Sequence, residues 1–498
     1  MIAETAATTP AGAAAGNQIR LLRSMRVLAG SQLVTWGLTL AWTVIVPRMI
    51  GPRGTGELTT ATATTGILLT LMELGLGVLL VREIATDRSR APSLITSALF
   101  VQASLYLPVV AVMAAFIHWS RFSPEQDLIL WLGVAGMLPA VLKLPMQSAF
   151  QATEKMGYIA LSGITTKLAG TVVGIGLVLT GFGVVALAAL GTAVECLTLG
   201  LNLGWLRRHF RLAHIDLASA RRVAVDSLPL FANYMIHSTY TWIDSVLLAV
   251  LTSAAVVGWY GVSSRILTTL LFVPVILSTA LLPRLSASFH GDLAELLVIA
   301  RRPIELVLSL SMPITAGAAL VVEPVIARLY GSAFDESAPV LAVLLASLPF
   351  TYFNILIWQI LVACHRQAVW TKVMAGMVVV NVALNLVLIG YTQHRFQNGA
   401  LGAAAALVVT EVLMSMIGVA LLPRLLDAGS AWRLARALLA TGVMAAAVWG
   451  ARSRGLLIQV PVGVAVFALL AMLLRILSRA ELSFLVQTTL RRREAPAA

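Results

Sequence analysis

Two ionisable residues of opposite charge lie inside consecutive apolar runs of this sequence. The stretch 241–286 reads TWIDSVLLAVLTSAAVVGWYGVSSRILTTLLFVPVILSTALLPRLS, with Asp244 in its first run and Arg265 in its second. At a rise of ~1.5 Å per residue, each lies roughly 10 Å from the short turn between the runs, so the two share a depth. Charges at such a depth are costly and mark either a functional site or a pair. Arg265 offers a planar fork of donors that suits a diphosphate. Arg265 either contacts an anionic ligand or pairs with Asp244. The two roles are compatible if the ligand competes with Asp244 for Arg265.

Two lysines also lie inside apolar runs, Lys143 and Lys167. They predict a cationic wall in the first half of the chain. The alternative is that they reach toward the membrane surface or pair with the acids Glu73 or Glu195.

Two glutamates, Glu195 and Glu411, occupy equivalent places in two similar segments, GVVALAALGTAVE (183–195) and GALGAAAALVVTE (399–411). They either lock helix packing or form a proton or cation site that drives a carrier. Arg48 and Arg53, between the first two runs, contact an anionic ligand on its release or are solvated loop charges.

The composition indicates a polytopic membrane protein. The chain has 498 residues, 59% of them hydrophobic and 11% charged, whereas soluble domains carry about 25% charged residues. The net charge of +13 would suggest nucleic acid on a soluble protein, but the distribution of the charges argues against that. Cys196 and Cys364 are too few for a disulfide framework or a metal site, so no metal or cofactor is expected.

Fourteen apolar runs near the spanning length of about 20 residues are found, which predicts an all-α membrane protein with about fourteen transmembrane helices. The runs are 27–47, 58–81, 93–117, 127–149, 158–180, 184–206, 226–250, 258–282, 303–322, 338–362, 370–390, 399–422, 433–450 and 455–477.

Basic residues favour one set of connections, which holds 25 of them against 7 in the other set. Because basic loops stay in the cytoplasm, both termini are expected inside a multi-pass protein of the cell membrane. Residues 1–26 begin with a polar stretch that lacks the apolar core of a signal peptide, and they read as a disordered tail.

The sequence also repeats. A shift of 202 positions places Gly258 on Gly56 and Arg284 on Arg82, but Asp244 on Trp42 and Arg265 on Ala63. We therefore expect two parallel six-helix lobes with unequal charges. The expected domains are a tail (1–26), the first lobe (27–206), an interfacial linker (207–225), the second lobe (226–422), helices 13 and 14 (423–478) and a second tail (479–498).

Catalytic and nucleotide-binding motifs are missing. No lysine follows a glycine, which excludes a phosphate-binding P-loop, and no HExxH occurs. The connections are too short for the active site of a membrane transferase. The chain is therefore not expected to be an enzyme, and transport would be secondary or facilitated.

Several stretches together resemble the MOP exporter superfamily, in particular the lipid-linked oligosaccharide flippases of polysaccharide biosynthesis. They are RMIGPRGTGEL (48–58), ELGLGVLLVREIA (73–85), WIDSVLLAVLTSAAVVGWYGVSSRIL (242–267), PRLS (283–286) and residues 381–411. The resemblance implies an alternating-access carrier that turns a polyprenyl-diphosphate-linked glycan from the inner to the outer leaflet. Its partners would be that substrate, membrane lipids and other polysaccharide-assembly proteins, with no nucleic acid.

Three other functions stay open. A cation-coupled multidrug exporter shares the resemblance, but it would favour acids in its cavity, whereas this chain carries Arg265, Lys143 and Lys167 as well. Lipid II is a further possible cargo. A non-transporting scaffold of a polysaccharide assembly complex is the last alternative.

Overall fold

The computed structural model describes residues 10–210, 212–289 and 293–476, and side chains from residue 35 onward except at 279–280 and 283–284. These residues form helices joined by short connections, and no strand occurs among them. The predicted all-α polytopic fold is confirmed. The C-terminal tail predicted at 479–498 lies outside the described residues.

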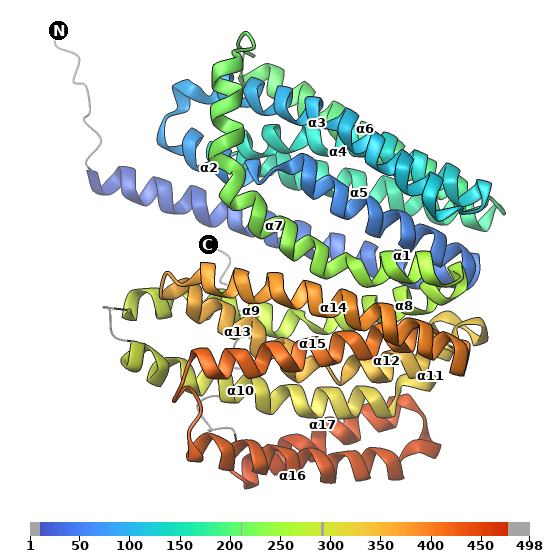
Figure 1. Cartoon of the computed structure of the whole chain (residues 1–498). Coiled ribbons are helices and arrows are strands. Elements are labelled where there is room, and N and C mark those ends of the chain that lie inside the picture. The colour runs from blue at the N-terminus through green and yellow to red at the C-terminus, as the bar shows by residue number, and fades with distance from the viewer. Residues whose placement is uncertain (1–9, 211, 290–292, 477–498) are drawn as a thin grey trace. The chain divides into compact units, whose positions relative to one another are not determined.

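The first compact unit is Met1–Gly258. In it, α4 packs along α6, α1 along α5 and α7, and α3 along α4 and α7 (Figure 1). Its helices are α1 (Pro10–Glu73), α2 (Leu76–Thr86), α3 (Ala91–Ser120), α4 (Pro124–Ala152), α5 (Met156–Leu179), α6 (Val184–His209), α7 (Leu217–Leu251) and the first turn of α8 (Ala254–Leu270).

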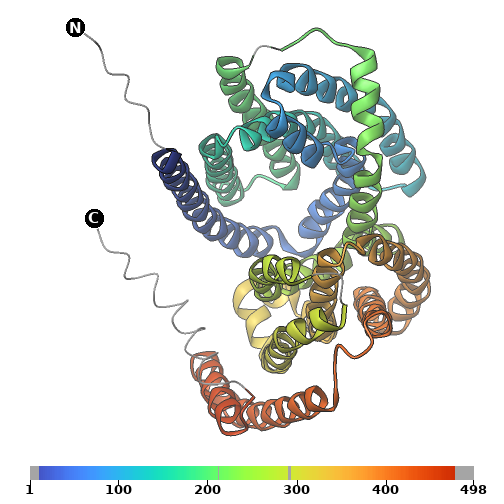
Figure 2. The same ribbon diagram turned by 90° about the vertical axis from the view of Figure 1, so that its left-hand side faces the viewer.

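The second compact unit is Trp259–Ala498. Here α14 packs along α15, and α10 lies along α13 and α16. Figure 2 shows α16 and α17 side by side at an edge of this unit. Besides the rest of α8, its helices are α9 (Phe272–Ser288), α10 (Leu293–Leu320), α11 (Val322–Tyr330), α12 (Ser337–Leu345), α13 (Leu348–Ala363), α14 (Gln367–Phe396), α15 (Ala400–Leu421), α16 (Ala428–Gly450) and α17 (Leu456–Leu473).

The first two predicted runs share α1, and the others each fall on one helix or on two helices separated by a short break, with the last run extending past the end of α17. Within the described residues, eleven helices are long and apolar enough to cross a membrane, or twelve if α12 and α13, bent by 45°, form one span. The difference from fourteen has two sources. Thr35–Thr86 counts as a single candidate although it holds two runs. In addition, α7 is too polar, because Asn233, His237 and Asp244 interrupt its apolar residues. The number fourteen stays a prediction.

A break at Gly51 separates the first two runs within α1. Gly51 has φ +73° and ψ 179°, a conformation that a residue with a Cβ rarely adopts. Pro47 and Pro52 flank it, and each removes a backbone donor from the helix. The chain therefore changes direction here without a separate loop.

Three boundaries differ from those expected. Residues 10–26, predicted as part of a tail without regular structure, begin α1. Residues 217–225 are not a separate interfacial linker but the first turns of α7. Finally, α7 belongs to the first unit, because it packs against α1, α2 and α3, so the division between units falls after Gly258 and not near 206–226.

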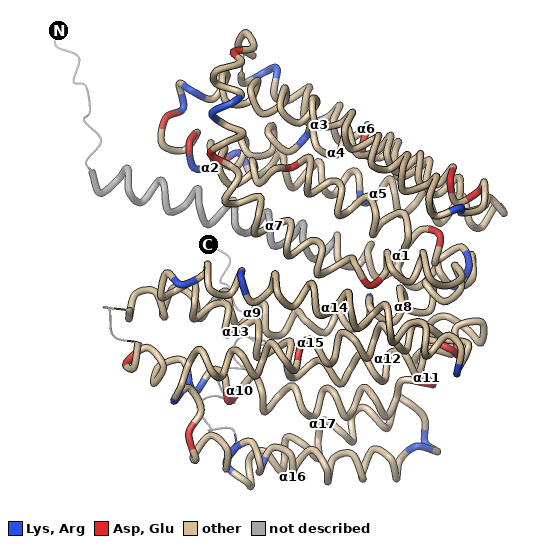
Figure 3. The backbone as a smooth tube through the Cα atoms, viewed as in Figure 1, with Lys and Arg blue, Asp and Glu red and all other residues tan. Residues whose placement is uncertain are grey.

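Charged residues gather near the helix ends in each unit, as Figure 3 shows. Apolar clusters fill the space between helices. The largest described cluster of the first unit includes Leu80, Ile95, Phe150 and Leu206, from four different helices. Because the space between helices is apolar, the few charged residues inside helices need partners. These charged residues form the candidate site.

Candidate functional site

Lys143 and Glu195 form an ion pair inside the first unit. The Nζ of Lys143, on α4, donates to a carboxylate oxygen of Glu195, on α6, and the two side chains are 18% and 32% exposed. Glu73, at the end of α1, lies close enough to Lys143 for electrostatic attraction. One lysine thus serves two acids from different helices, which lowers the cost of placing these charges within membrane-spanning elements. This is one of the two arrangements that the sequence left open for Lys143.

Two further charged residues of this unit lie on α5 and α7. Lys167 is half-buried on α5, and Asp244 is buried on α7. A shared cationic wall of the two lysines stays a prediction.

Another charged group borders a cavity between α1 and the α7–α8 turn. Arg53 Nε donates to Glu57 at 3.1 Å, and its Nη2 lies 3.9 Å from Glu125. Arg53 is 69% exposed, whereas Glu57 is buried. The cavity has a volume of about 380 Å³ and is lined by Arg53, Glu57, Phe122, Gln126, Thr252 and Ser253 among others. Arg48, farther back on α1, is exposed.

Two glycines bring α1 and the first turn of α8 into backbone contact beside this cavity. A Cβ at Gly56 would lie 1.7 Å from the carbonyl oxygen of Ala254, and one at Gly258 would lie 2.0 Å from that of Pro52. No side chain larger than hydrogen fits at either position without moving a helix. These are the two glycines that the 202-residue shift superimposes.

In the second unit, Arg265 is half-buried on α8. It lies within electrostatic reach of Tyr330 at the end of α11. Asp244 belongs to the first unit and Arg265 to the second. Their pairing stays a prediction.

Glu411 is buried on α15 and binds α13. Asn354 Nδ2 donates to its Oε2 at 2.8 Å and to its carbonyl oxygen at 3.0 Å. Ser415 Oγ in turn donates to Asn354 Oδ1 at 3.1 Å. Glu195 and Glu411 therefore have different partners, a lysine in one case and an amide in the other.

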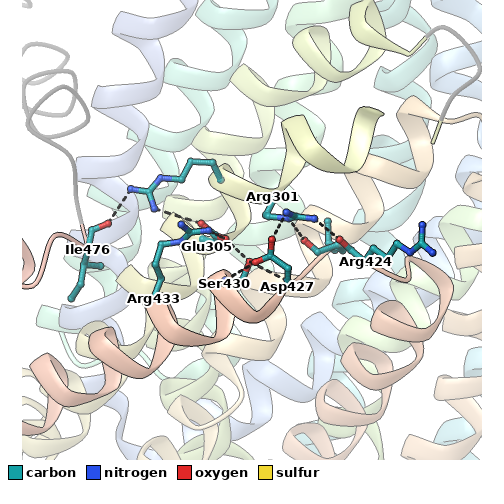
Figure 4. Close-up of polar contacts among 9 residues, drawn as sticks. Arg301, Glu305, Arg424, Asp427, Ser430, Arg433 and Ile476 are labelled. Carbon is teal, nitrogen blue, oxygen red and sulfur yellow. Dashed lines mark hydrogen bonds and ion pairs between the residues drawn. The ribbon is translucent and has the colours of Figure 1, made fainter. Parts of the chain in front are cut away.

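A cluster of charges around Glu305 joins α16 to α10 (Figure 4). The Glu305 side chain is only 1% exposed, and Arg433 Nη2 donates to it at 2.6 Å, with Arg302 Nη1 at 3.5 Å. Ser430 Oγ also donates to Glu305. Both hydrogen bonds go to Oε1, whereas the buried Oε2 accepts none from the described residues and has only the ion pair with Arg302.

Arg301 extends this cluster to the α15–α16 connection. Its guanidinium donates to the carbonyl oxygens of Leu425 at 3.0 Å and Arg424 at 2.7 Å, and it pairs with Asp427. Hydrogen bonds from the Ser430 amide and hydroxyl, followed by the charges of Arg301 and Arg433, hold the pKa of the Asp427 carboxyl below its usual value. The N-terminus of α16 is therefore fixed by charge as well as by its capping box.

Sequence reasoning missed two of these groups. It treated the arginines of the Glu305 cluster only as an orientation signal, and it gave no role to Glu57. The spacing of four residues between Arg53 and Glu57 was a usable signal for an ion pair on one helix face. In the part of the chain that the structure describes, no group of three metal-binding side chains occurs.

The fold is that of the transporters of the MOP superfamily. The structure matches a lipid II flippase MurJ in an inward closed conformation with a TM-score of 0.74, at 13% identity, over 91% of this chain and 99% of that one. It matches an inward-facing MATE family multidrug resistance transporter with a TM-score of 0.64, at 15% identity, over 80% of this chain and 94% of that one. At these identities the likeness establishes the fold alone.

Residues 21–289 match the family described as polysaccharide biosynthesis protein, and the chain belongs to that family. It is also similar to "Probable flippase AglR" of Haloferax volcanii, at 27% identity over 276 residues. The match covers 54% of each protein, so the chain spans about half the length of this curated relative.

Proposed function

We propose that this protein is a flippase that moves a polyprenyl-diphosphate-linked oligosaccharide from the inner to the outer leaflet by alternating access. The family supports a role in polysaccharide biosynthesis, and the name of the relative supports the activity of a flippase. The observation that carries the proposal is the ion pair of Lys143 with Glu195. In this pair, Lys143 is a cation within membrane-spanning helices, and 18% of its side chain stays exposed.

The proposed mechanism is an exchange of counterions. In the empty carrier, Glu195 neutralises Lys143; when substrate arrives, a diphosphate oxygen takes the place of the carboxylate. Because each state keeps the cation paired, neither pays the full cost of an isolated charge in the membrane. Arg265 supplies further donors to the diphosphate, and Asp244 is the acid with which the substrate competes. Lys167, Arg48 and Arg53 are proposed contacts along the path of the anion, with Glu73 and Glu411 as coupling or packing acids.

The driving force would come from gradients, in keeping with a transporter that is not an enzyme. A diphosphate that moves outward carries negative charge toward the positive side of the membrane. This is worth about 2.3 kcal/mol per charge per 100 mV if the charge crosses the full field uncompensated.

The proposed setting is the cell membrane, with both termini in the cytoplasm because the basic connections face inward. The proposed partners are the lipid-linked glycan, the surrounding lipids and other proteins of polysaccharide assembly.

The test is the sidedness of a labelled polyprenyl-diphosphate glycan in proteoliposomes. Wild type should expose the lipid to an outside modifying enzyme faster than empty vesicles do, and Arg265→Ala should abolish the gain. The matched control is Arg454→Ala, which removes an exposed arginine from the connection between α16 and α17 and should behave as wild type.

Other results identify the competing functions. Export of an organic cation down a proton or sodium gradient, without exposure of the glycolipid, would mean a MATE-like exporter. Selective exposure of lipid II would narrow the cargo to the cell-wall precursor. No transport of any of these substrates would favour a scaffold.

A further inference from the structure

A second, polar cavity lies in the first unit, where α3 and α7 begin. It has a volume of about 240 Å³ and is lined by Arg90, Ser93, Leu94, Asp216, Ser219 and Arg222. Five of these six residues are polar or charged. None of them takes part in the proposed transport mechanism.

The walls of this cavity are held in place by packing and hydrogen bonds. Ser93 Oγ and Ser219 Oγ are 3.4 Å apart and join α3 to α7. The Ala213 amide donates to Thr96 Oγ1 at 3.2 Å, which fixes the α6–α7 connection to α3. Leu94 lines the cavity and belongs to the buried apolar cluster that also contains Val223. The site is therefore preformed.

The charges around the cavity favour an anion. Arg90 Nη1 donates to the Glu83 carboxylate at 3.1 Å, and this contact orients the Arg90 side chain. The other N–H groups of the Arg90 guanidinium stay available. Arg222 is exposed, and no acid of the described residues forms an ion pair with it. The acid in the lining is Asp216, whose two carboxylate oxygens accept from the Ala218 and Ser219 amides at 3.1 Å each. Asp216 is thus engaged in capping α7. The donors that remain among the lining residues are the two guanidiniums and whichever of the two serine hydroxyls does not donate to the other.

We propose that this cavity binds a phosphate group through Arg90, Arg222, Ser93 and Ser219. Guanidinium and hydroxyl donors match the several acceptor oxygens of a phosphate. Basic pockets between helices on the cytoplasmic side of a membrane protein suit anionic lipid headgroups. The cavity lies among the connections that carry the excess of basic residues, which places it on that side. The phosphate belongs either to an anionic phospholipid headgroup or to a soluble phosphate compound.

The test uses the purified full-length protein in a neutral detergent. Thermal unfolding is followed as a function of added dihexanoyl phosphatidylglycerol, with dihexanoyl phosphatidylcholine as the uncharged reference. A parallel titration uses inorganic phosphate against chloride at equal ionic strength. The decisive variant is Arg222→Gln. Arg221→Gln is the matched control, because it removes the same charge from the adjacent exposed position, which does not line the cavity.

Phosphatidylglycerol should raise the melting temperature of wild type and of Arg221→Gln with equal apparent affinity, and Arg222→Gln should bind about tenfold more weakly. The same pattern with inorganic phosphate alone would assign the site to a soluble phosphate compound. Ser219→Ala is a second variant that keeps every charge and should also weaken binding. The proposal is overturned if Arg221→Gln and Arg222→Gln respond alike, or if neither phosphate probe stabilises wild type beyond its reference.

Discussion

Lys143 and Glu195 show how the chain places charges inside membrane-spanning helices. Neither side chain is more than a third exposed, so removal of one partner leaves the other charge poorly compensated. The geometry requires α4 and α6 to lie side by side, and these helices do pack along each other.

A double-mutant cycle tests this pair. Lys143→Met should lower the free energy of unfolding by about 1.5–3 kcal/mol, since a charged hydrogen bond is lost. Lys143→Met combined with Glu195→Gln should recover part of that loss, because no uncompensated charge remains. The measurement is denaturant unfolding in detergent. Strictly additive effects of the two substitutions would contradict a direct interaction.

Asp427 predicts a pH dependence at the N-terminus of α16. Its pKa is held below the usual 3.8 by the hydrogen bonds from Ser430 and the charges of Arg301 and Arg433. The folded state therefore favours the carboxylate. The contribution to stability is complete above the usual value and is lost as the pH falls through the lower pKa of the folded protein.

We expect hydrogen exchange in the first turn of α16 to accelerate as the pH falls below about 4, after correction for intrinsic exchange rates. Asp427→Asn should show faster exchange at neutral pH and little further change on acidification. An equal acid response of wild type and variant would assign the effect to another group.

At the scale of elements, the contact between α1 and α8 depends on the absence of side chains. A methyl group at Gly56 would overlap the carbonyl oxygen of Ala254. Gly56→Ala should therefore destabilise the protein by about 1–3 kcal/mol, as overpacking of a tight contact does. Gly37→Ala is the control on the same helix, since no atom lies within 4 Å of its added methyl group.

The comparison of the two variants by thermal unfolding separates packing from helix propensity. Alanine at an open helical position is neutral or stabilising by up to about 1 kcal/mol relative to glycine. If both substitutions had the same effect, the close approach of α1 and α8 would not be a tight contact in solution.

The sequence predicted helices well and their partners poorly. Apolar runs locate the helices because the membrane requires about 20 apolar residues per crossing, whatever the tertiary context. The break at Gly51 was visible as a glycine beside a proline. By contrast, Glu305 and Arg433 are 128 positions apart, and no local pattern reports such a contact. The sequence offered Glu195 and Glu73 as partners of Lys143, and nothing in it distinguishes the two acids.

At the scale of the whole molecule, the positive-inside pattern makes a prediction that is independent of transport. In a variant with Cys196 and Cys364 replaced, Ser453→Cys should react with an impermeant maleimide in intact cells. Thr86→Cys, exposed at the end of α2, should react only after the membrane is permeabilised. Labelling of Thr86→Cys in intact cells would invert the proposed orientation.

The reciprocal contact of the two glycines bears on the origin of the chain. Gly56 meets Ala254 and Gly258 meets Pro52, and a shift of 202 positions converts each of these pairs into the other. The two copies of the repeat thus contribute the same two positions, and each position contacts the other position in the opposite copy. Such a contact is called isologous and occurs at the two-fold axis of a homodimer. If the predicted repeat of 202 positions arose by duplication, this contact would correspond to one between two identical half-length proteins. In such a dimer the glycine of each copy would face a backbone carbonyl group of the other copy, so one substitution would disturb the contact twice.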